Sequence, residues 1–177
     1  MSNFIDLLYK RKSIREFTDY ALSEAEITLL MESATRAPNA CNFQSWHFYA
    51  VSNRDVINSF YSAEGSAIYG GKWITEAAMV VVVCTDAKEL EKRFGDRGSN
   101  LFAVQDTAAA ITNILLQAAD IGLGGCWIGA FNEDKCRELL DIPAQRRPVA
   151  LLPIGKPKSD PSERGRKPLN DVVTMIK

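Results

Sequence analysis

The chain has 177 residues and a mass of 19.6 kDa, so we expect a single domain over residues 1–177. At this length about 70% of the unfolded surface can be buried, enough for a core without disulfides or structural metals. The net charge of −1, from 21 basic and 22 acidic residues, offers no general attraction to nucleic acid or to an anionic membrane. The longest apolar run, Ala77 to Cys84, is too short to cross a bilayer.

The N-terminus and the cysteines indicate a reducing compartment. Apolar residues at helical spacing within 4–8 precede a basic cluster, which is the reverse of the order in a signal peptide. The four cysteines, at positions 41, 84, 126 and 136, form no CxxC and no short paired spacing. We therefore expect buried, hydrophobic thiols in a soluble, cytoplasmic protein.

Hydrophobic periodicity and turn residues divide the chain into helices and strands, without repeats or linkers. Ser23 and Glu26 form a capping-box pattern ahead of apolar residues at helical spacing. Four consecutive valines within 77–85 are typical of a strand that is buried on both faces. The first half predicts a helix at 4–9, a helix from Ser23 to a turn at Pro38, a loop to Ser45, a strand at 46–51, a helix after Asn53, a loop at 65–71 and a strand at 77–85. The second half predicts a polar, glycine-broken stretch at 86–99, a long helix at 101–121, a glycine stop at 122–125, a strand at 126–131, a helix at 133–140, a strand at 149–155 and a charged tail.

The order of these elements favours an α+β fold, with one mostly antiparallel sheet flanked by helices. The sequence has no strict βαβ rhythm, and the dinucleotide-binding fingerprint that starts at Gly122 fails because its third glycine position is Trp127. The P-loop spacing of Gly65 and Gly70 fails because position 71 is glycine where lysine is required. The helix at 101–121 is apolar most of the way round, which suits the centre of a core or an interface.

The side chains alone provide no recognisable catalyst. His47 is the only histidine, and the HExxH, CxxC and GxSxG patterns are absent, so we expect neither a metal site nor a serine hydrolase centre. Cys41 and His47 could act as nucleophile and base, but a loop cysteine beside a strand histidine is the simpler interpretation. These absences indicate that the chemistry comes from a bound cofactor.

Two basic clusters interrupt the neutral average. Lys10, Arg11, Lys12 and Arg15 surround Ser13, and a second group at 164–167 lies near the other end of the chain. Arginine grips a phosphate with two parallel hydrogen bonds, and a serine hydroxyl adds a donor. The two clusters form one phosphate site if the chain ends meet, and two solvated charged faces if they do not.

Two further segments suit a flat, polar ring. The loop at 37–46 contains Asn42 and Gln44, whose amides donate and accept hydrogen bonds at the edge of a heterocycle. The glycine-rich segment at 122–129 could expose backbone amides where a ring approaches closely. An ordinary turn and a helix stop followed by a strand are the simpler alternatives for these two segments.

Taken together, these segments resemble the nitroreductase family of FMN-dependent oxidoreductases. The matching stretches occur in the family's order and span almost the whole chain. They are RKSIREF at 11–17, APNACNFQSW at 37–46, GLGGCWIG at 122–129, PIGKP at 153–157 and RGRKPL at 164–169.

The resemblance implies an intertwined homodimer with FMN in each of two clefts between the subunits and NADH or NADPH as electron donor. It assigns no catalytic side chain, because N5 of the flavin carries the hydride. The resemblance implies that Arg11, Ser13 and Arg15 contact the phosphate, ribityl chain and pyrimidine edge, with Lys12 inside the same motif, and that Arg164 and Arg166 contact the phosphate. It implies that the backbone of Ile128 and Gly129 contacts the ring near N5. The flavin of the other subunit is expected to be contacted by the loop residues Pro38, Asn39, Ala40 and Asn42. Gln44 is expected near the substrate.

The chain departs from the family pattern in ways that affect the substrate. Asn39 replaces a common serine, Ser45 replaces the usual proline before tryptophan, and the short chain leaves little room for helices that roof the site. The expected activity is reduction of nitroaromatics, quinones or similar electron-poor compounds by a ping-pong mechanism. The alternatives are another reaction on the same scaffold (dehalogenation, enoate reduction or flavin breakdown), a non-catalytic FMN-binding or sensing protein, and an anion-binding module without flavin.

Overall fold

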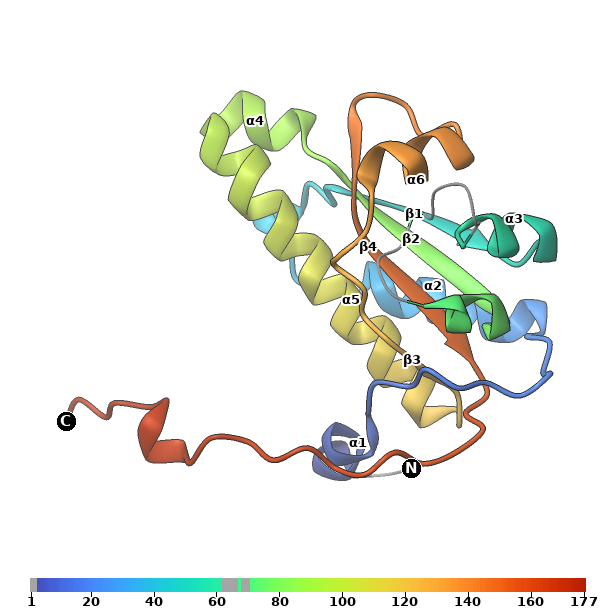
Figure 1. Ribbon diagram of the computed structural model, residues 1–177. Coiled ribbons are helices and arrows are strands. Elements are labelled where there is room, and N and C mark those ends of the chain that lie inside the picture. The colour runs from blue at the N-terminus through green and yellow to red at the C-terminus, as the bar shows by residue number, and fades with distance from the viewer. Residues whose placement is uncertain (1–2, 62–66, 68–70) are drawn as a thin grey trace.

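A four-stranded antiparallel sheet in the order β1-β2-β4-β3 runs through the protein (Figure 1). The computed structural model describes residues 3–61, 67 and 71–177. The strands are β1 (Trp46–Val51), β2 (Met79–Asp86), β3 (Gly124–Gly125) and β4 (Arg146–Gly155). In the central pairing, Val82 of β2 lies opposite Tyr49 of β1 and Leu151 of β4. The expected α+β fold with a mostly antiparallel sheet is confirmed.

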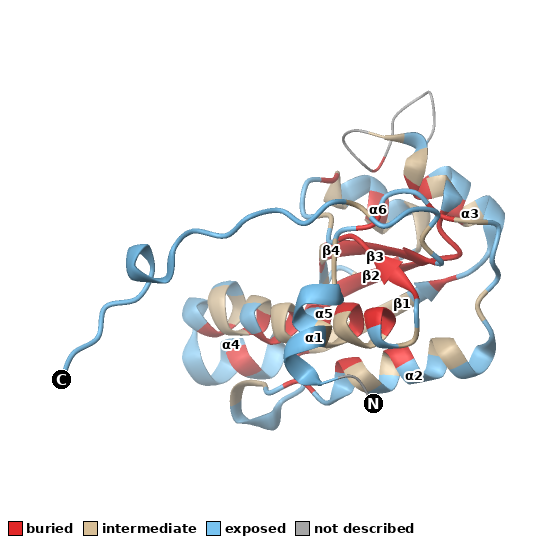
Figure 2. Cartoon of the chain, turned by 90° about the horizontal axis from the view of Figure 1, so that it is seen from below, coloured by how far each residue is buried: buried red, intermediate tan, exposed pale blue. Residues whose placement is uncertain are grey.

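Helices cover both faces of the sheet (Figure 2). Strand β2 is buried along almost its whole length, and its side chains alternate between the two faces as the valine run predicts. Val80 and Val82 share a core with residues of α3 (Arg54–Ser59) and α6 (Glu133–Leu139). Val81 and Val83 share the other core with residues of α2 (Glu24–Thr35) and α5 (Ala103–Asp120).

The predicted capping box at the start of α2 is confirmed. The Glu26 amide donates to Ser23 Oγ at 3.3 Å, and the Ser23 amide donates to Glu26 Oε2 at 2.7 Å. Helix α1 (Phe4–Lys10) also forms where expected, but none of its residues is buried. Leu7 is half-buried, whereas Phe4, Ile5 and Leu8 are exposed in the described part of the chain.

Three expectations from the sequence are wrong. The polar stretch at 86–99 contains a helix, α4 (Lys88–Phe94), whose signal is weak because only Leu90 is buried. The strand expected at 126–131 is not formed as a continuous strand: beyond β3, an isolated bridge joins Ile128 to Leu151, and Phe131 is a second isolated bridge residue. Cys41 is exposed, whereas the other three cysteines are buried as expected.

Smaller segments complete the chain. A π-helical turn (Gly98–Phe102) precedes α5, and short 3-10 turns cover Ala40–Asn42, Lys72–Glu76 and Leu169–Asp171. Apart from residues 67 and 71, the loop expected at 65–71 lies outside the described residues. None of the helices described is long and apolar enough to span a membrane.

The last part of the chain leaves the body of the protein. Beyond β4 it passes α1 and then extends away from the rest of the fold (Figure 1). Its apolar side chains at Leu169, Val172, Val173, Met175 and Ile176 are exposed, with Ile176 at 95%.

Candidate functional site

The N-terminal basic segment is fixed to the edge of the sheet at β3. The Ile14 amide donates to the Gly125 carbonyl at 3.0 Å, and Ser13 bridges to the same glycine. A Cβ on Gly124 would lie 2.4 Å from Ile14 Cγ1, and one on Gly125 would lie 2.8 Å from the Pro153 carbonyl oxygen. The two glycines are therefore needed for close packing of the protein against itself, which differs from the ring approach considered from the sequence.

The C-terminal segment runs beside the same N-terminal residues. The Thr18 amide donates to the Lys156 carbonyl at 2.9 Å, and the Lys158 amide donates to the Glu16 carbonyl at 3.0 Å. The Lys12 ammonium then pairs with Asp160, with 2.8 Å between Nζ and Oδ1. These contacts direct residues 161–166 past α1.

As a result, the two basic clusters line one cleft of about 530 Å³, which we call the basic cleft. Five basic side chains and one acidic side chain, Glu163, line it, and α1 contributes an apolar wall. Its volume lies within the range of small-molecule sites. The lining residues are Ile5, Leu8, Tyr9, Arg11, Lys12, Ser13, Arg15, Pro161, Ser162, Glu163, Arg164 and Arg166.

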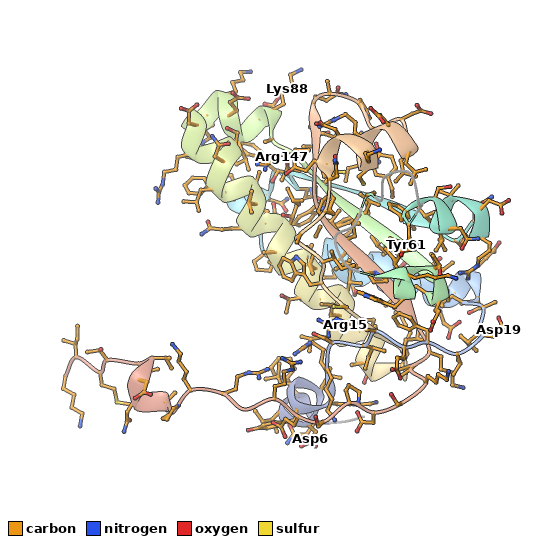
Figure 3. All side chains as sticks on the ribbon, in the orientation of Figure 1. Asp6, Arg15, Asp19, Tyr61, Lys88 and Arg147 are labelled. Carbon is orange, nitrogen blue, oxygen red and sulfur yellow. The ribbon has the colours of Figure 1, made fainter. Side chains whose placement is uncertain are left out.

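Arg15 occupies the side of this cleft nearest the sheet, on the segment that follows α1 (Figure 3). Its guanidinium lies 5.9 Å from the ring centre of Trp73, a cation–π contact with a residue of the Lys72–Glu76 turn. Burial raises the pKa of the neighbouring Cys126 thiol, although Arg15, Ser13 and Arg11 oppose that rise. Cys126 is therefore an inert thiol beneath a basic surface.

The loop at 37–45 adopts an unusual backbone shape. Cys41, Asn42 and Gln44 all have positive φ angles, of 54°, 55° and 52°. The side chain of Asn39 stabilises this shape, because its Oδ1 accepts from the Gln44 amide at 2.8 Å and its Nδ2 donates to the Ala37 carbonyl at 3.3 Å. The Gln44 side chain donates to the Asn42 carbonyl at 3.4 Å.

A buried carboxylate on α5 anchors the loop. Asp106 accepts from the Ala40 amide at 2.9 Å and from Ser45 Oγ at 2.7 Å. Asp106 and Ser45 are 5% and 2% exposed. The amide of Ala40 is thus already used within the chain.

The backbone of Ile128 is also used. Its amide donates to the Leu151 carbonyl at 2.9 Å, and its carbonyl accepts from the Leu151 amide at 3.0 Å. The Ile128 amide proton is therefore taken by the sheet, and the expected contact of the Ile128 backbone with a ligand stays a prediction. The Gly129 amide donates to no backbone carbonyl among the described residues, and a Cβ at this glycine would meet nothing within 4 Å.

The loop and the basic cleft lie toward opposite ends of α5. Asp106 holds the loop near the start of the helix, whereas Ala119, near its end, lines a smaller pocket that shares Arg11 and Lys12 with the basic cleft. Ala119 lies thirteen positions after Asp106 on the helix, a distance of about 20 Å at 1.5 Å per residue. One chain therefore does not bring its own loop to its own cleft.

The histidine lies in neither place. The His47 ring packs edge-on against Tyr49, with 4.8 Å between ring centres. Its pKa is lowered, chiefly by desolvation and also by the charge of Arg146, with Asp86 opposing. Within the described residues, no group of three or more histidine, cysteine or acidic side chains could hold a metal ion.

Comparison with known proteins identifies the family of the chain. The Nitroreductase family model matches residues 8–69 and 66–156. The chain belongs to the nitroreductase family. A protein of Archaeoglobus fulgidus named for NADH dehydrogenase and NAD(P)H nitroreductase is 33% identical over 90% of this chain and 88% of its own length. The NADPH-dependent FMN reductase of Bacillus subtilis is 29% identical over 95% of this chain and 71% of its own length. A nitroreductase family protein of Clostridium novyi superposes with a TM-score of 0.77 and 32% identity, covering 89% of this chain and 88% of that one.

The structure adds two residues that the family motifs did not indicate. Trp73 reaches Arg15 from a turn that follows residues outside the described part, and no sequence pattern connects the two. Asp106 lies 66 residues from Ala40 in the sequence. Its only signal is a carboxylate within a helix that is apolar most of the way round, where a buried charge needs partners.

Proposed function

We propose that this nitroreductase family member passes electrons from NADH or NADPH, by way of FMN, to nitroaromatic compounds, quinones or similar electron-poor acceptors. An NAD(P)H-dependent oxidoreductase that uses FMN is the enzyme class of the family. The observation that carries the proposal is the basic cleft, where clusters from both ends of the chain meet. FMN suits this cleft, because its phosphate matches the arginines and its size matches the volume.

In this proposal, Arg11, Arg164 and Arg166 bind the phosphate, and Ser13 donates a hydrogen bond to the ribityl chain. Lys12 is held by Asp160 at the rim of the cleft and adds to the positive potential there. Arg15 holds a positive charge at the pyrimidine edge, where it would stabilise negative charge that develops on the ring. Bound FMN supplies hydride transfer at N5, near which the Gly129 amide would lie; this amide donates to no backbone carbonyl in the part of the chain that the structure describes.

We place the remaining loop residues at the flavin of a second subunit. The loop is anchored near the start of α5, whereas the basic cleft lies near the end of that helix. The loop residues therefore do not reach the cleft of their own chain, and a homodimer would complete each site with Pro38, Asn39, Ala40 and Asn42 of the other subunit. The uncovered apolar residues of α1 and of the tail after residue 168 support such an interface. Gln44 would then lie near the acceptor, with its backbone set by Asn39.

We further propose one domain over residues 1–177 in the cytoplasm. The described strands form one sheet, and the helices pack against it through a hydrophobic core on each face. Three buried cysteines and an exposed one without a disulfide suit a reducing compartment.

Steady-state kinetics test the proposed mechanism. Donor and acceptor would share the exposed face of the flavin, so reciprocal plots against NAD(P)H at several acceptor concentrations should be parallel. His47→Ala should keep most of the activity, because His47 packs on Tyr49 and removal of a true acid or base typically costs about 10²–10⁴-fold. Intersecting lines together with a loss of that size would favour a ternary complex with proton transfer by histidine.

A further inference from the structure

The loop that would reach the partner's flavin has a backbone shape that its own residues disfavour. Cys41 and Gln44, which are not glycines, have φ angles of 54° and 52°. Side chains with a Cβ adopt this left-handed region only at a cost in energy. The hydrogen bonds of Asn39 offset part of this cost from within the loop, and contacts from outside the loop can offset more of it.

Asp106 provides the contacts from outside. Its two carboxylate oxygens accept from opposite ends of the loop: Oδ1 from the Ala40 amide and Oδ2 from the Ser45 hydroxyl. The carboxylate is almost fully buried, and it forms no ion pair with a lysine or arginine among the described residues. Both carboxylate oxygens are thus satisfied by hydrogen-bond donors from the loop.

The position of these contacts links them to the cofactor. Ala40 is itself an expected cofactor contact, and Ser45 closes the loop immediately before β1. Ser45 stands where the family usually has proline, which has no hydroxyl to offer. The hydrogen bond from Ser45 to Asp106 can therefore fix the loop in this chain, whereas a relative with proline at this position cannot form it.

We infer that Asp106 is a positioning residue for the FMN site: it holds the loop at residues 38–44 in the shape that meets the partner's flavin. This inference rests on the proposed function. Asp106 acts through its two hydrogen bonds and does not touch the cofactor. A neutral group of the same shape that makes both bonds should therefore replace it.

Four single variants separate this role from simple stability. Asp106→Leu removes both bonds at similar volume, and Ser45→Ala removes one of them. Asp106→Asn keeps both contacts, with Oδ1 accepting from Ala40 and Nδ2 donating to Ser45 Oγ. The matched control is Thr107→Val, because Thr107 is equally buried on the same helix but donates to the Val104 carbonyl rather than to the loop.

Two measurements read out the loop. In FMN-free protein, amide hydrogen exchange of Ala40 should be roughly tenfold faster in Asp106→Leu than in wild type, the equivalent of one lost hydrogen bond. Asp106→Asn and Thr107→Val should stay close to wild type. In FMN-loaded protein, the rate of FMN dissociation should follow the same order, with Ser45→Ala between wild type and Asp106→Leu.

The possible failures are distinct. Equal Ala40 exchange in Asp106→Leu and Thr107→Val, or equal FMN dissociation from the two loaded variants, would overturn the positioning role. Loss of exchange protection in Asp106→Asn as large as in Asp106→Leu would overturn the claim that hydrogen bonding, and not charge, is what matters. Wild-type protein that binds no FMN would instead refute the proposed function, and the exchange measurement would still decide whether Asp106 holds the loop.

Discussion

The Lys12 ammonium contacts the Asp160 carboxylate at 2.8 Å, across 148 residues of sequence. This pair joins the N-terminal basic segment to the start of the C-terminal tail, but Asp160 is largely exposed. An exposed ion pair contributes about 0–1 kcal/mol to stability. Two backbone hydrogen bonds already join the N-terminal and C-terminal segments here. Asp160→Asn should therefore lower the free energy of unfolding by less than about 1 kcal/mol and leave FMN affinity nearly unchanged. Urea denaturation and an FMN titration check both parts, and a large loss in either would show that the pair organises the cleft.

The arginines of the basic cleft should behave differently. Arg11→Ala or Arg166→Ala should weaken FMN binding roughly ten- to hundredfold, since a hydrogen bond to a charged group is worth about 1.5–3 kcal/mol. The fold should survive, because exposed charges contribute little to stability.

The control for overall charge is Lys88→Ala, which removes a cation far from Arg15 (Figure 3). That variant should bind FMN as the wild type does. Unchanged affinity in both arginine variants would mean that the clusters are solvated charged faces.

The exposed tail predicts an assembly that depends on it. The full chain should sediment as a dimer of about twice 19.6 kDa. Val172→Ser with Ile176→Ser should raise the dimer dissociation constant more than roughly tenfold, since burial of one such side chain is worth about 1.5–3 kcal/mol. Sedimentation at several concentrations measures this, and an FMN-loaded monomer of the wild type would contradict it.

His47 should make stability depend on pH. Its pKa is lowered in the folded protein, so the folded state binds this proton less readily than the unfolded state. Its contribution to stability is therefore present above its ordinary pKa of about 6.5 and is lost as the pH falls through the lowered value. His47→Phe keeps an aromatic ring against Tyr49 but cannot bind a proton. Below pH ~6.5 this variant should therefore lose less stability on acidification than the wild type. The slope of its unfolding free energy against pH should differ from that of the wild type by the equivalent of less than one proton. Urea denaturation of both proteins at neutral and mildly acidic pH tests this, and identical pH profiles would argue against it.

Local signals made much of the fold predictable. The Ser23–Glu26 capping box and the valine run of β2 depend on neighbours in the sequence, and both formed as expected. Helix α4 was missed because only Leu90 is buried, so it lacks an apolar stripe. The prediction of a strand at 126–131 was wrong because the apolar pattern of this segment does not reveal its pairing. In the structure the segment pairs with β4 through an isolated bridge at Ile128 rather than along a continuous strand.

The site was predictable in its parts but not in its connections. Family motifs marked Arg11, Ser13 and Arg164, and the fold brings the two basic clusters into one cleft. The contacts of Asp106 with Ala40 and Ser45 cross more than sixty residues, and no local pattern encodes them. Likewise, only the pairing of Ile128 with Leu151 shows that the Ile128 amide is unavailable.

The most direct test of the central claim is an anaerobic titration of the purified, FMN-reconstituted protein with NADH and with NADPH, followed by visible absorbance. We expect about one FMN per chain, bleaching of the flavin by at least one of the two donors, and return of the colour when a quinone or nitroaromatic compound is added. Failure to retain FMN, or a bound flavin that neither donor bleaches, would contradict it.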